Sequence, residues 1–155
     1  IDHCVEHLPD AAVGIDILAG FPGESDLHFR AALAFLNSIH FSYLHVFPYS
    51  RRPGTRAADF SNQVKKKVKE ARVSELRQLS SLRRKQFYTR QLGQTRPVIV
   101  EGRRSRDGLL KGFTDNYVAV CFQGPDYLLD QVARVRLLSL MKDTVFGEYA
   151  EHHES

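Results

Sequence analysis

The chain has 155 residues, of which 43% are hydrophobic and 26% are charged, the proportions of a soluble globular protein. No apolar run approaches the roughly 20 residues that a bilayer-spanning helix needs. The first residues also lack the basic and apolar regions of a secretory signal. We therefore expect a cytoplasmic protein with no membrane partner. The chain does not begin with Met, which predicts a piece of a longer protein.

The positive charge is concentrated in the middle of the chain. Residues 61–111 contain fifteen Lys or Arg against four Asp or Glu, whereas the remaining residues contain seven basic and fourteen acidic ones. Such a local excess favours a polyanionic partner, with nucleic acid the leading candidate. The alternative is a solvated helix face rich in lysine.

The first half alternates apolar strands with helices. We expect a helix end in residues 1–11 and a short strand in 13–19, followed by a turn with two glycines and a proline. Ser25 is a favourable N-cap for a helix whose apolar residues recur every three or four positions as far as Ile39. Residues 41–47 are aromatic or β-branched almost throughout, which is typical of a strand covered on both faces.

A second polar turn follows that strand. Pro48 is expected to end the strand pairing because it has no N–H to donate, and Pro53-Gly54 predicts a turn. A strand–helix–strand unit of this kind has parallel strands joined by a right-handed crossover. Both turns then lie at the carboxyl edge of one sheet, where α/β folds bind their ligands. An ordinary basic surface loop is the alternative.

A long basic helix is expected from Gln63 to about Leu92, because this segment contains no Gly or Pro. Gly93 is a reasonable C-cap. The expected apolar stripe is imperfect and consists of Val64, Val68, Ala71, Leu76, Leu79, Leu82 and Phe87. The basic residues between them are expected to face solvent or phosphates.

After Gly93 the pattern changes to short strands separated by tight turns. The expected strands are residues 97–101, 109–114, 117–122, 131–137 and 145–149, which predict a small closed antiparallel barrel of the oligonucleotide-binding kind. The expected fold class is a partial (β/α) barrel, represented by its last two strand–helix units, followed by this small barrel. We place the domains at residues 1–92 and 93–155.

Few residues suggest a metal site. Cys4 and Cys121 lie far apart and lack metal-ligand spacing. His3 and His7 have the helical i, i+4 spacing and Glu6 lies between them, but they lie at the edge of the chain. We expect no metal ligand among these residues.

Several motifs resemble the second half of the radical S-adenosylmethionine (SAM) tRNA methylthiotransferases. They are Gly20-Phe21-Pro22-Gly23-Glu24, then Val46-Phe47-Pro48-Tyr49-Ser50 with Arg52-Pro53-Gly54-Thr55 and Ala57-Ala58. Val98-Ile99-Val100-Glu101-Gly102 and Gly112–Val120 resemble the TRAM domain of the same family. The resemblance runs from about residue 10 to residue 149, and the His-Val-Phe-Pro-Tyr-Ser form is similar to the branch acting on threonylcarbamoyladenosine in tRNA.

The resemblance implies a reaction that this chain cannot complete alone. The family attaches a methylthio group to position 2 of a modified adenosine next to the anticodon, using SAM and two 4Fe–4S clusters. Its Cys-x-x-x-Cys-x-x-Cys motif is missing from the 155 residues. Cys4 and Cys121 cannot replace that motif, so no cluster, no catalytic residue and no independent activity are expected here.

The resemblance also implies two sets of binding residues. Those expected near the cofactor or nucleoside are Gly20, Pro22, Gly23, Glu24, Phe47, Tyr49, Ser50, Arg52 and Thr55. Those expected to contact the anticodon stem-loop of tRNA are Lys65, Arg103, Arg104, Arg106, Lys111 and Tyr117. For the first turn, a tight turn with Glu24 as a helix-start charge is the alternative.

Phe113 and Tyr117 are ambiguous, and at least one of them is expected in the barrel core. Asn116 is expected to serve the turn. Two rival interpretations remain: a stand-alone RNA-binding module without catalysis, and an assembly piece that self-associates through an open barrel edge.

Overall fold

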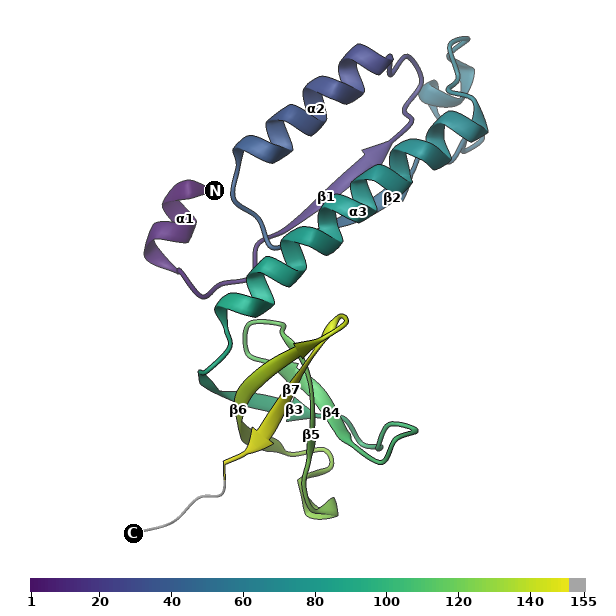
Figure 1. The fold of residues 1–155 in the computed structure, drawn as a ribbon. Helices are drawn as coiled ribbons and strands as arrows, with labels where there is room; N and C mark the ends of the chain where they lie inside the picture. The colour runs from purple at the N-terminus through teal and green to yellow at the C-terminus, as the bar shows by residue number, and fades with distance from the viewer. Residues whose placement is uncertain (151–155) are drawn as a thin grey trace. The chain divides into compact units, whose positions relative to one another are not determined.

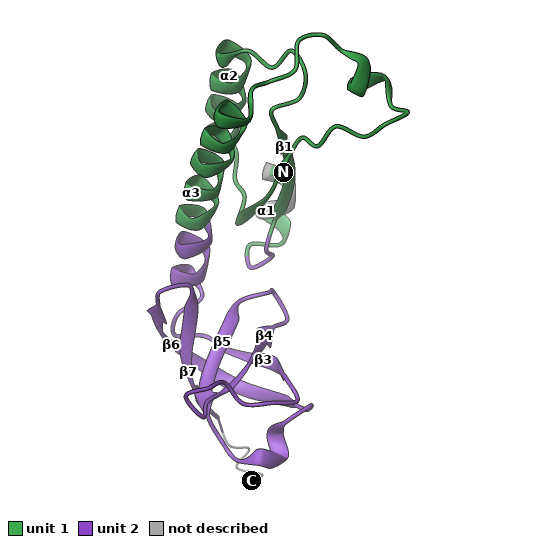
Figure 2. Ribbon diagram, turned by 90° about the vertical axis from the view of Figure 1, so that its right-hand side faces the viewer, with its two compact units in different colours: residues 1–9, 13–83 green, residues 10–12, 84–155 purple. Residues whose placement is uncertain are grey.

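The computed structural model describes residues 1–150, with the backbone alone for residues 2, 4 and 5. It divides into two compact units, one of residues 1–9 and 13–83 and the other of residues 10–12 and 84–155 (Figure 2). The domain boundary near residue 93 stays a prediction. The thiol of Cys4 and the C-terminal residues 151–155 lie outside the description.

The first unit contains two strand–helix repeats. Helix α1 (Asp2–His7) precedes strand β1 (Gly14–Ala19), helix α2 (Asp26–Ser38) and strand β2 (Tyr43–Pro48), as Figure 1 shows. A short 3₁₀ helix, η1 (Arg56–Asp59), leads to the long helix α3 (Lys66–Arg90). Ser25 is the N-cap of α2, as predicted: its Oγ accepts from His28 N–H, and His28 Nδ1 accepts from Ser25 N–H.

The two strands are parallel and pair from Gly14 with Tyr43 to Ala19 with Pro48. The parallel arrangement is confirmed and the pairing ends at Pro48 as predicted, although the missing N–H of the proline is not what ends it. Tyr49 N–H donates to Ala19 O at 2.8 Å, one residue beyond the proline. Successive N–H groups point to opposite sides of a strand, so the nitrogen of Pro48 points away from β1. The missing N–H of Pro48 therefore removes no hydrogen bond between the two strands.

The expected coverage of β2 on both faces is wrong. One face packs against α2 and α3 through a core of Phe29, Leu33, Leu36, Phe41, Leu44, Val73 and Leu76. On the other face Leu18 of β1 and Phe47 of β2 are about half exposed (49% and 53%). Among the described residues no element covers that second face, so the burial alternates along each strand.

Helix α3 occupies part of the free edge of β2. Ser80 is buried, and its Oγ accepts from Leu44 N–H at 2.8 Å and donates to Leu44 O at 3.1 Å. Leu44 and Pro48 both direct their backbone groups away from β1. The serine and the proline therefore leave little of this edge available for another strand.

The predicted extent of α3 is close to the observed one, but its predicted buried face is partly wrong. Ala71 and Leu82 are exposed, whereas Arg72, Val73 and Ser80 are buried. The helix ends at Arg90, and Gly93 (φ 86°) follows it by three residues. Gly93 N–H donates to Leu137 O rather than closing the helix.

The second unit is a closed barrel of five strands in the order β3-β4-β5-β7-β6. Their bounds are β3 (Thr95–Val100), β4 (Leu110–Thr114), β5 (Ala119–Gln123), β6 (Val132–Met141) and β7 (Thr144–Tyr149), with a 3₁₀ turn η2 at Asp126–Leu128. All the strand pairs of the barrel are antiparallel except β5 with β7, which is parallel. The predicted barrel is thus confirmed, with mixed rather than purely antiparallel pairing.

The barrel interior is apolar, and its core includes Val98, Leu110, Val120, Phe122, Val135, Leu137 and Val145. The prediction that Phe113 or Tyr117 belongs to the core is wrong, because they are 47% and 69% exposed. Phe113 alternates with the inward-facing Gly112 and Thr114, so it points outward. Tyr117 lies in the β4–β5 turn, with a positive φ of 64°.

Asn116 does more than the predicted turn role. Its amide is buried, accepting from Thr114 Oγ1 at 2.6 Å and donating to Gln91 Oε1 and to Asp10 O. Arg96 makes a 2.6 Å ion pair with Asp10. These contacts explain why residues 10–12 group with the barrel.

Within residues 1–150, none of the helices has the length and apolarity to cross a bilayer.

Candidate functional site

The two predicted turns lie at the same edge of the sheet. Residues 20–24 follow β1 and residues 49–55 follow β2, and both strands run in the same direction (Figure 1). The turns are also joined directly, because the rings of Phe21 and Tyr49 pack edge to face with centroids 5.4 Å apart. A ligand at this edge would therefore meet both turns.

The first turn depends on two glycines. Gly20 (φ 79°) and Gly23 (φ 86°) adopt backbone conformations that favour glycine. A Cβ on Gly20 would overlap the side chain of Lys69, and one on Gly23 would lie 2.6 Å from Asn62 Nδ2. Gly23 N–H also donates to Asn62 O at 2.9 Å. The glycines thus allow close packing against the segment that starts α3.

Glu24 closes this turn from within. One carboxylate oxygen accepts from Gly20 N–H at 2.8 Å, and the other pairs with Arg72 Nη1 at 2.8 Å. The same Nη1 donates to Glu24 O, and Arg72 Nη2 pairs with Asp26. Arg72 is 5% exposed. Both carboxylate oxygens of Glu24 are therefore engaged in the protein, which favours the structural alternative for this residue.

Lys69, one helical turn before Arg72, holds the second turn. Its Nζ donates to Tyr49 O at 3.1 Å and lies 5.8 Å from the centre of the Tyr49 ring. The stem of Lys69 lies against Gly20. Two basic residues of α3 thus hold the two turns of this edge: Arg72 contacts the turn after β1, and Lys69 contacts the turn after β2.

Tyr49 supplies a polar group that the described residues leave unsatisfied. Its side chain is 9% exposed, and its hydroxyl has no hydrogen-bond partner among the described residues. Phe21 also packs against Phe60, with centroids 6.3 Å apart. The rings of Phe21, Tyr49 and Phe60 thus form an aromatic group at this edge, and such a group suits the flat face of a ligand such as a nucleoside.

The remaining predicted residues of this edge differ in exposure. Phe47, Ser50 and Arg52 are exposed, while Pro22 is buried in the first turn. Thr55 is exposed, and its Oγ1 donates to Arg52 O at 2.8 Å. The structure therefore brings all the predicted residues of this set to one edge, where Ser50 and Arg52 are exposed.

The residues of this chain do not fit an iron–sulfur cluster. The sequence has two cysteines, and a 4Fe–4S cluster is held by several thiolates. Cys121 lies on β5, in the barrel unit, and burial raises the pKa of its thiol. A raised pKa disfavours the thiolate that would bind iron.

The predicted RNA-binding residues fall into both units. Lys65 is exposed just before α3, whereas the others belong to the barrel. Arg103 and Arg106 are exposed in the β3–β4 loop. Arg104 is engaged in the protein: it pairs with Asp126 at 2.6 Å and donates to the carbonyls of Gly108 and Gly124.

Lys111 and Tyr117 are placed differently from the three arginines. Lys111, on β4, forms a 2.6 Å ion pair with Glu101. Tyr117 lies in the turn at the other end of β4 from the arginine loop, so the whole strand separates them. The structure thus puts these residues on one hairpin but at its two ends.

An exposed apolar row crosses the barrel between those ends. Phe113 of β4 pairs in register with Ile99 of β3, which pairs with Val132 of β6. Ile99 and Val132 are 67% and 64% exposed. Next to Val132 on the same face of β6 come the exposed Arg134 and Arg136. We call Ile99, Phe113 and Val132 the apolar row.

The sequence reasoning missed five residues of these two surfaces: Phe21, Lys69 and Arg72 at the sheet edge, and Ile99 and Val132 on the barrel. Phe21 could have been predicted from the sequence, because it is an aromatic residue inside a turn formed by two glycines and a proline. The sequence pattern places Lys69 and Arg72 on a basic helix face. Only the packing of α3 shows that they point toward the turns.

Comparison with known proteins identifies relatives. No protein-family model matches the chain. The chain is 36% identical over 134 residues to the threonylcarbamoyladenosine tRNA methylthiotransferase MtaB of Bacillus subtilis, covering 84% of this chain and 30% of the relative. It is 35% identical over 147 residues to the tRNA-2-methylthio-N(6)-dimethylallyladenosine synthase of Maricaulis maris, covering 95% of this chain and 32% of the relative.

A third relative is the threonylcarbamoyladenosine tRNA methylthiotransferase MtaB of Aquifex aeolicus, 33% identical over 125 residues, which are 80% of this chain and 29% of that protein. The chain therefore spans about a third of the length of the curated relatives it matches. The closed barrel is consistent with the TRAM domain of these proteins. Over most of its length, the chain is homologous to the C-terminal part of the tRNA methylthiotransferases.

Proposed function

We propose that this chain supplies part of the SAM or nucleoside site and the tRNA-binding domain of a tRNA methylthiotransferase. The enzyme would attach a methylthio group to position 2 of a modified adenosine next to the anticodon, by radical SAM chemistry. The observation that carries the proposal is the common edge of the parallel strands, where the turns after β1 and β2 meet through the rings of Phe21 and Tyr49.

At this edge the chain's own groups would bind and orient the adenosyl part of SAM. Phe21 and Phe47 offer exposed apolar surface to the flat face of the ligand, and the ring of Tyr49 packs edge to face against Phe21. Arg52 is suited to a carboxylate or phosphate because its guanidinium can make two parallel hydrogen bonds. SAM would supply the radical chemistry, together with clusters held by cysteines that these 155 residues lack.

The barrel would bind the anticodon stem-loop. Unpaired bases stack on apolar and aromatic side chains, and arginines neutralise phosphates. The apolar row provides such a platform, and Arg103, Arg106, Arg134 and Arg136 are exposed on the same unit. Arg104 and Lys111 already have partners in the protein, so we assign the larger share of the phosphate contacts to the exposed arginines.

Two measurements test the proposal. In the first, the 155-residue chain is titrated into a labelled anticodon stem-loop, and an unrelated hairpin of the same length serves as control. In the second, the chain replaces the matching C-terminal part of the Bacillus subtilis relative. The methylthio content of tRNA is then measured by mass spectrometry in a strain lacking that enzyme.

The enzymatic proposal expects the chimera to restore the modified nucleoside and Phe47→Ala or Arg52→Ala to reduce it. Tight stem-loop binding by the chain, with a well-expressed chimera that makes no product, would favour the RNA-binding module without catalysis. Equal affinity for both hairpins would contradict a specific tRNA role for the barrel.

A further inference from the structure

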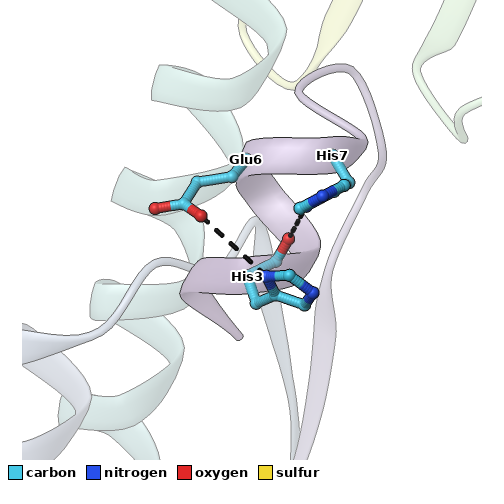
Figure 3. A group of neighbouring side chains, drawn as sticks. All are labelled: His3, Glu6 and His7. Carbon is cyan, nitrogen blue, oxygen red and sulfur yellow. Dashed lines mark hydrogen bonds and ion pairs between the residues drawn. The ribbon is translucent and has the colours of Figure 1, made fainter.

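Helix α1 carries three potential metal ligands on one face. His3, Glu6 and His7 are spaced by three and four residues, which places them on the same side of a helix. Figure 3 shows the carboxylate of Glu6 joined to the ring of His3 by the ion pair, and the ring of His7 next to the main-chain carbonyl of His3. Within the part of the chain that the structure describes, they form the group whose ligand atoms come within 4.8 Å of one another.

His7 is already oriented as a ligand. Its Nδ1 lies 2.9 Å from the carbonyl oxygen of His3, one helical turn earlier (Figure 3). Because a carbonyl only accepts, this hydrogen bond places the ring proton on Nδ1. Nε2 then keeps its lone pair for a metal, and a backbone carbonyl on the other ring nitrogen is the usual support of a metal-binding histidine.

The other two ligands can reach the same point. His3 Nδ1 lies 4.0 Å from a carboxylate oxygen of Glu6, and the two imidazole rings lie 4.2 Å apart between centroids. Zinc needs ligand atoms at about 2.0–2.2 Å, so the atoms must close slightly around it. All three side chains are exposed, so their rotamers can change.

Contrary to the expectation from the sequence, we propose that His3, Glu6 and His7 bind one Zn²⁺ ion. Two imidazole nitrogens and one carboxylate oxygen form a donor set typical of zinc with one position left for water or an external ligand. The hard cations Mg²⁺ and Ca²⁺ prefer oxygen ligands and are excluded by the two nitrogens. The ion would bridge the ends of a six-residue helix, so binding stabilises that turn.

The proposal is independent of the tRNA function, because none of the three residues belongs to the sheet edge or the barrel. Its test is a zinc titration of the chain. Calorimetry measures the stoichiometry and affinity, and the NMR signals of the imidazole rings report which histidines bind. His152→Ala and His153→Ala are introduced first so that these two imidazoles, consecutive in the sequence, cannot bind the ion. We expect one Zn²⁺ per chain, simultaneous shifts of the His3 and His7 signals, and reversal by EDTA.

Variants identify the ligands. His7→Asn should lower the zinc affinity by at least about tenfold, since loss of an outer-shell contact alone costs that much, and Glu6→Gln should lower it as well. His45→Asn removes an exposed imidazole from β2 and should leave the affinity unchanged. Cobalt in place of zinc should give the visible spectrum of a nitrogen- and oxygen-bound ion.

Two results would overturn the site. One is a stoichiometry near zero, or an affinity that survives His7→Asn while the remaining NMR spectrum is unchanged. The other is a thiolate band in the cobalt spectrum of the chain that retains Cys4, together with loss of binding in Cys4→Ser. That result would show that a cysteine, and not Glu6, is the third ligand.

Discussion

Arg72 of helix α3 holds Glu24 of the β1–α2 turn through both its carboxylate and its main-chain oxygen, at 2.8 and 2.9 Å. A buried arginine from an element 48 residues away in sequence thus fixes the turn that we propose to face the ligand. The ion pair with the largely exposed Asp26 adds little, because water screens it.

Arg72→Ala is expected to lower the free energy of unfolding by about 3 kcal/mol, since it leaves Glu24 with an uncompensated, partly buried charge. Urea unfolding followed by circular dichroism measures the change. Arg77→Ala is the matched control, because Arg77 is exposed on the same helix. Equal stability of the two variants would show that the Arg72 contacts do not stabilise the turn.

The bond between Ser80 and Leu44 gives a second prediction. Ser80→Ala should cost about 1–3 kcal/mol, because it leaves the N–H and the carbonyl of Leu44 without a partner in a buried position. Ser74→Ala, at an exposed position of α3, should change the stability by less than about 0.5 kcal/mol. Hydrogen exchange at the Leu44 amide should accelerate only in the first variant.

The glycine turn can be tested with a control that has the same backbone conformation. Gly20 and Gly54 have φ values of 79° and 80°, but only a Cβ on Gly20 would meet another residue, Lys69. Both alanine variants pay about 1–2 kcal/mol for a left-handed conformation. We expect Gly20→Ala to be clearly the less stable in thermal unfolding. Equal melting temperatures would contradict the close packing of Lys69 on the turn.

Cys121 should react slowly with thiol reagents at neutral pH. Burial raises the pKa of its thiol, and the thiolate is the reactive form. In a Cys4→Ser background, the rate of alkylation should keep rising with pH beyond the value at which a free cysteine levels off. A rate profile that matches free cysteine would contradict the shift.

The same shift predicts how stability depends on pH. The unfolded thiol loses its proton at lower pH than the folded one. The contribution of Cys121 is therefore fully present below the unfolded pKa and is lost as the pH rises through the folded value. Cys121→Ser should remove this part of the alkaline loss of stability.

The apolar row predicts the effect of one aromatic residue on RNA binding. Phe113→Ala should weaken binding of the anticodon stem-loop by about 1–3 kcal/mol if a base stacks there. Tyr127→Ala removes an aromatic side chain that is 68% exposed elsewhere on the barrel and serves as control. Arg103→Ala should instead reduce the salt dependence of binding by about one charge. Fluorescence anisotropy at several salt concentrations separates the two effects.

The sequence by itself determined the order and type of the elements, because they depend on local patterns. The periodicity of α2, the N-cap at Ser25 and the glycines of the first turn act over a few residues, and so do the strand and turn signals of the barrel. The parallel pairing of β1 and β2 follows from the helix between them. The shared edge of the two turns could therefore be predicted without coordinates.

Only the tertiary structure decided which side chains face inward and what they contact. Lys69 and Arg72 look like other basic residues of α3 until the helix packs on the turns. Ile99, Phe113 and Val132 are far apart in sequence and become a row only through the strand register. Contacts between distant residues depend on how whole elements pack, and local sequence patterns do not carry that information.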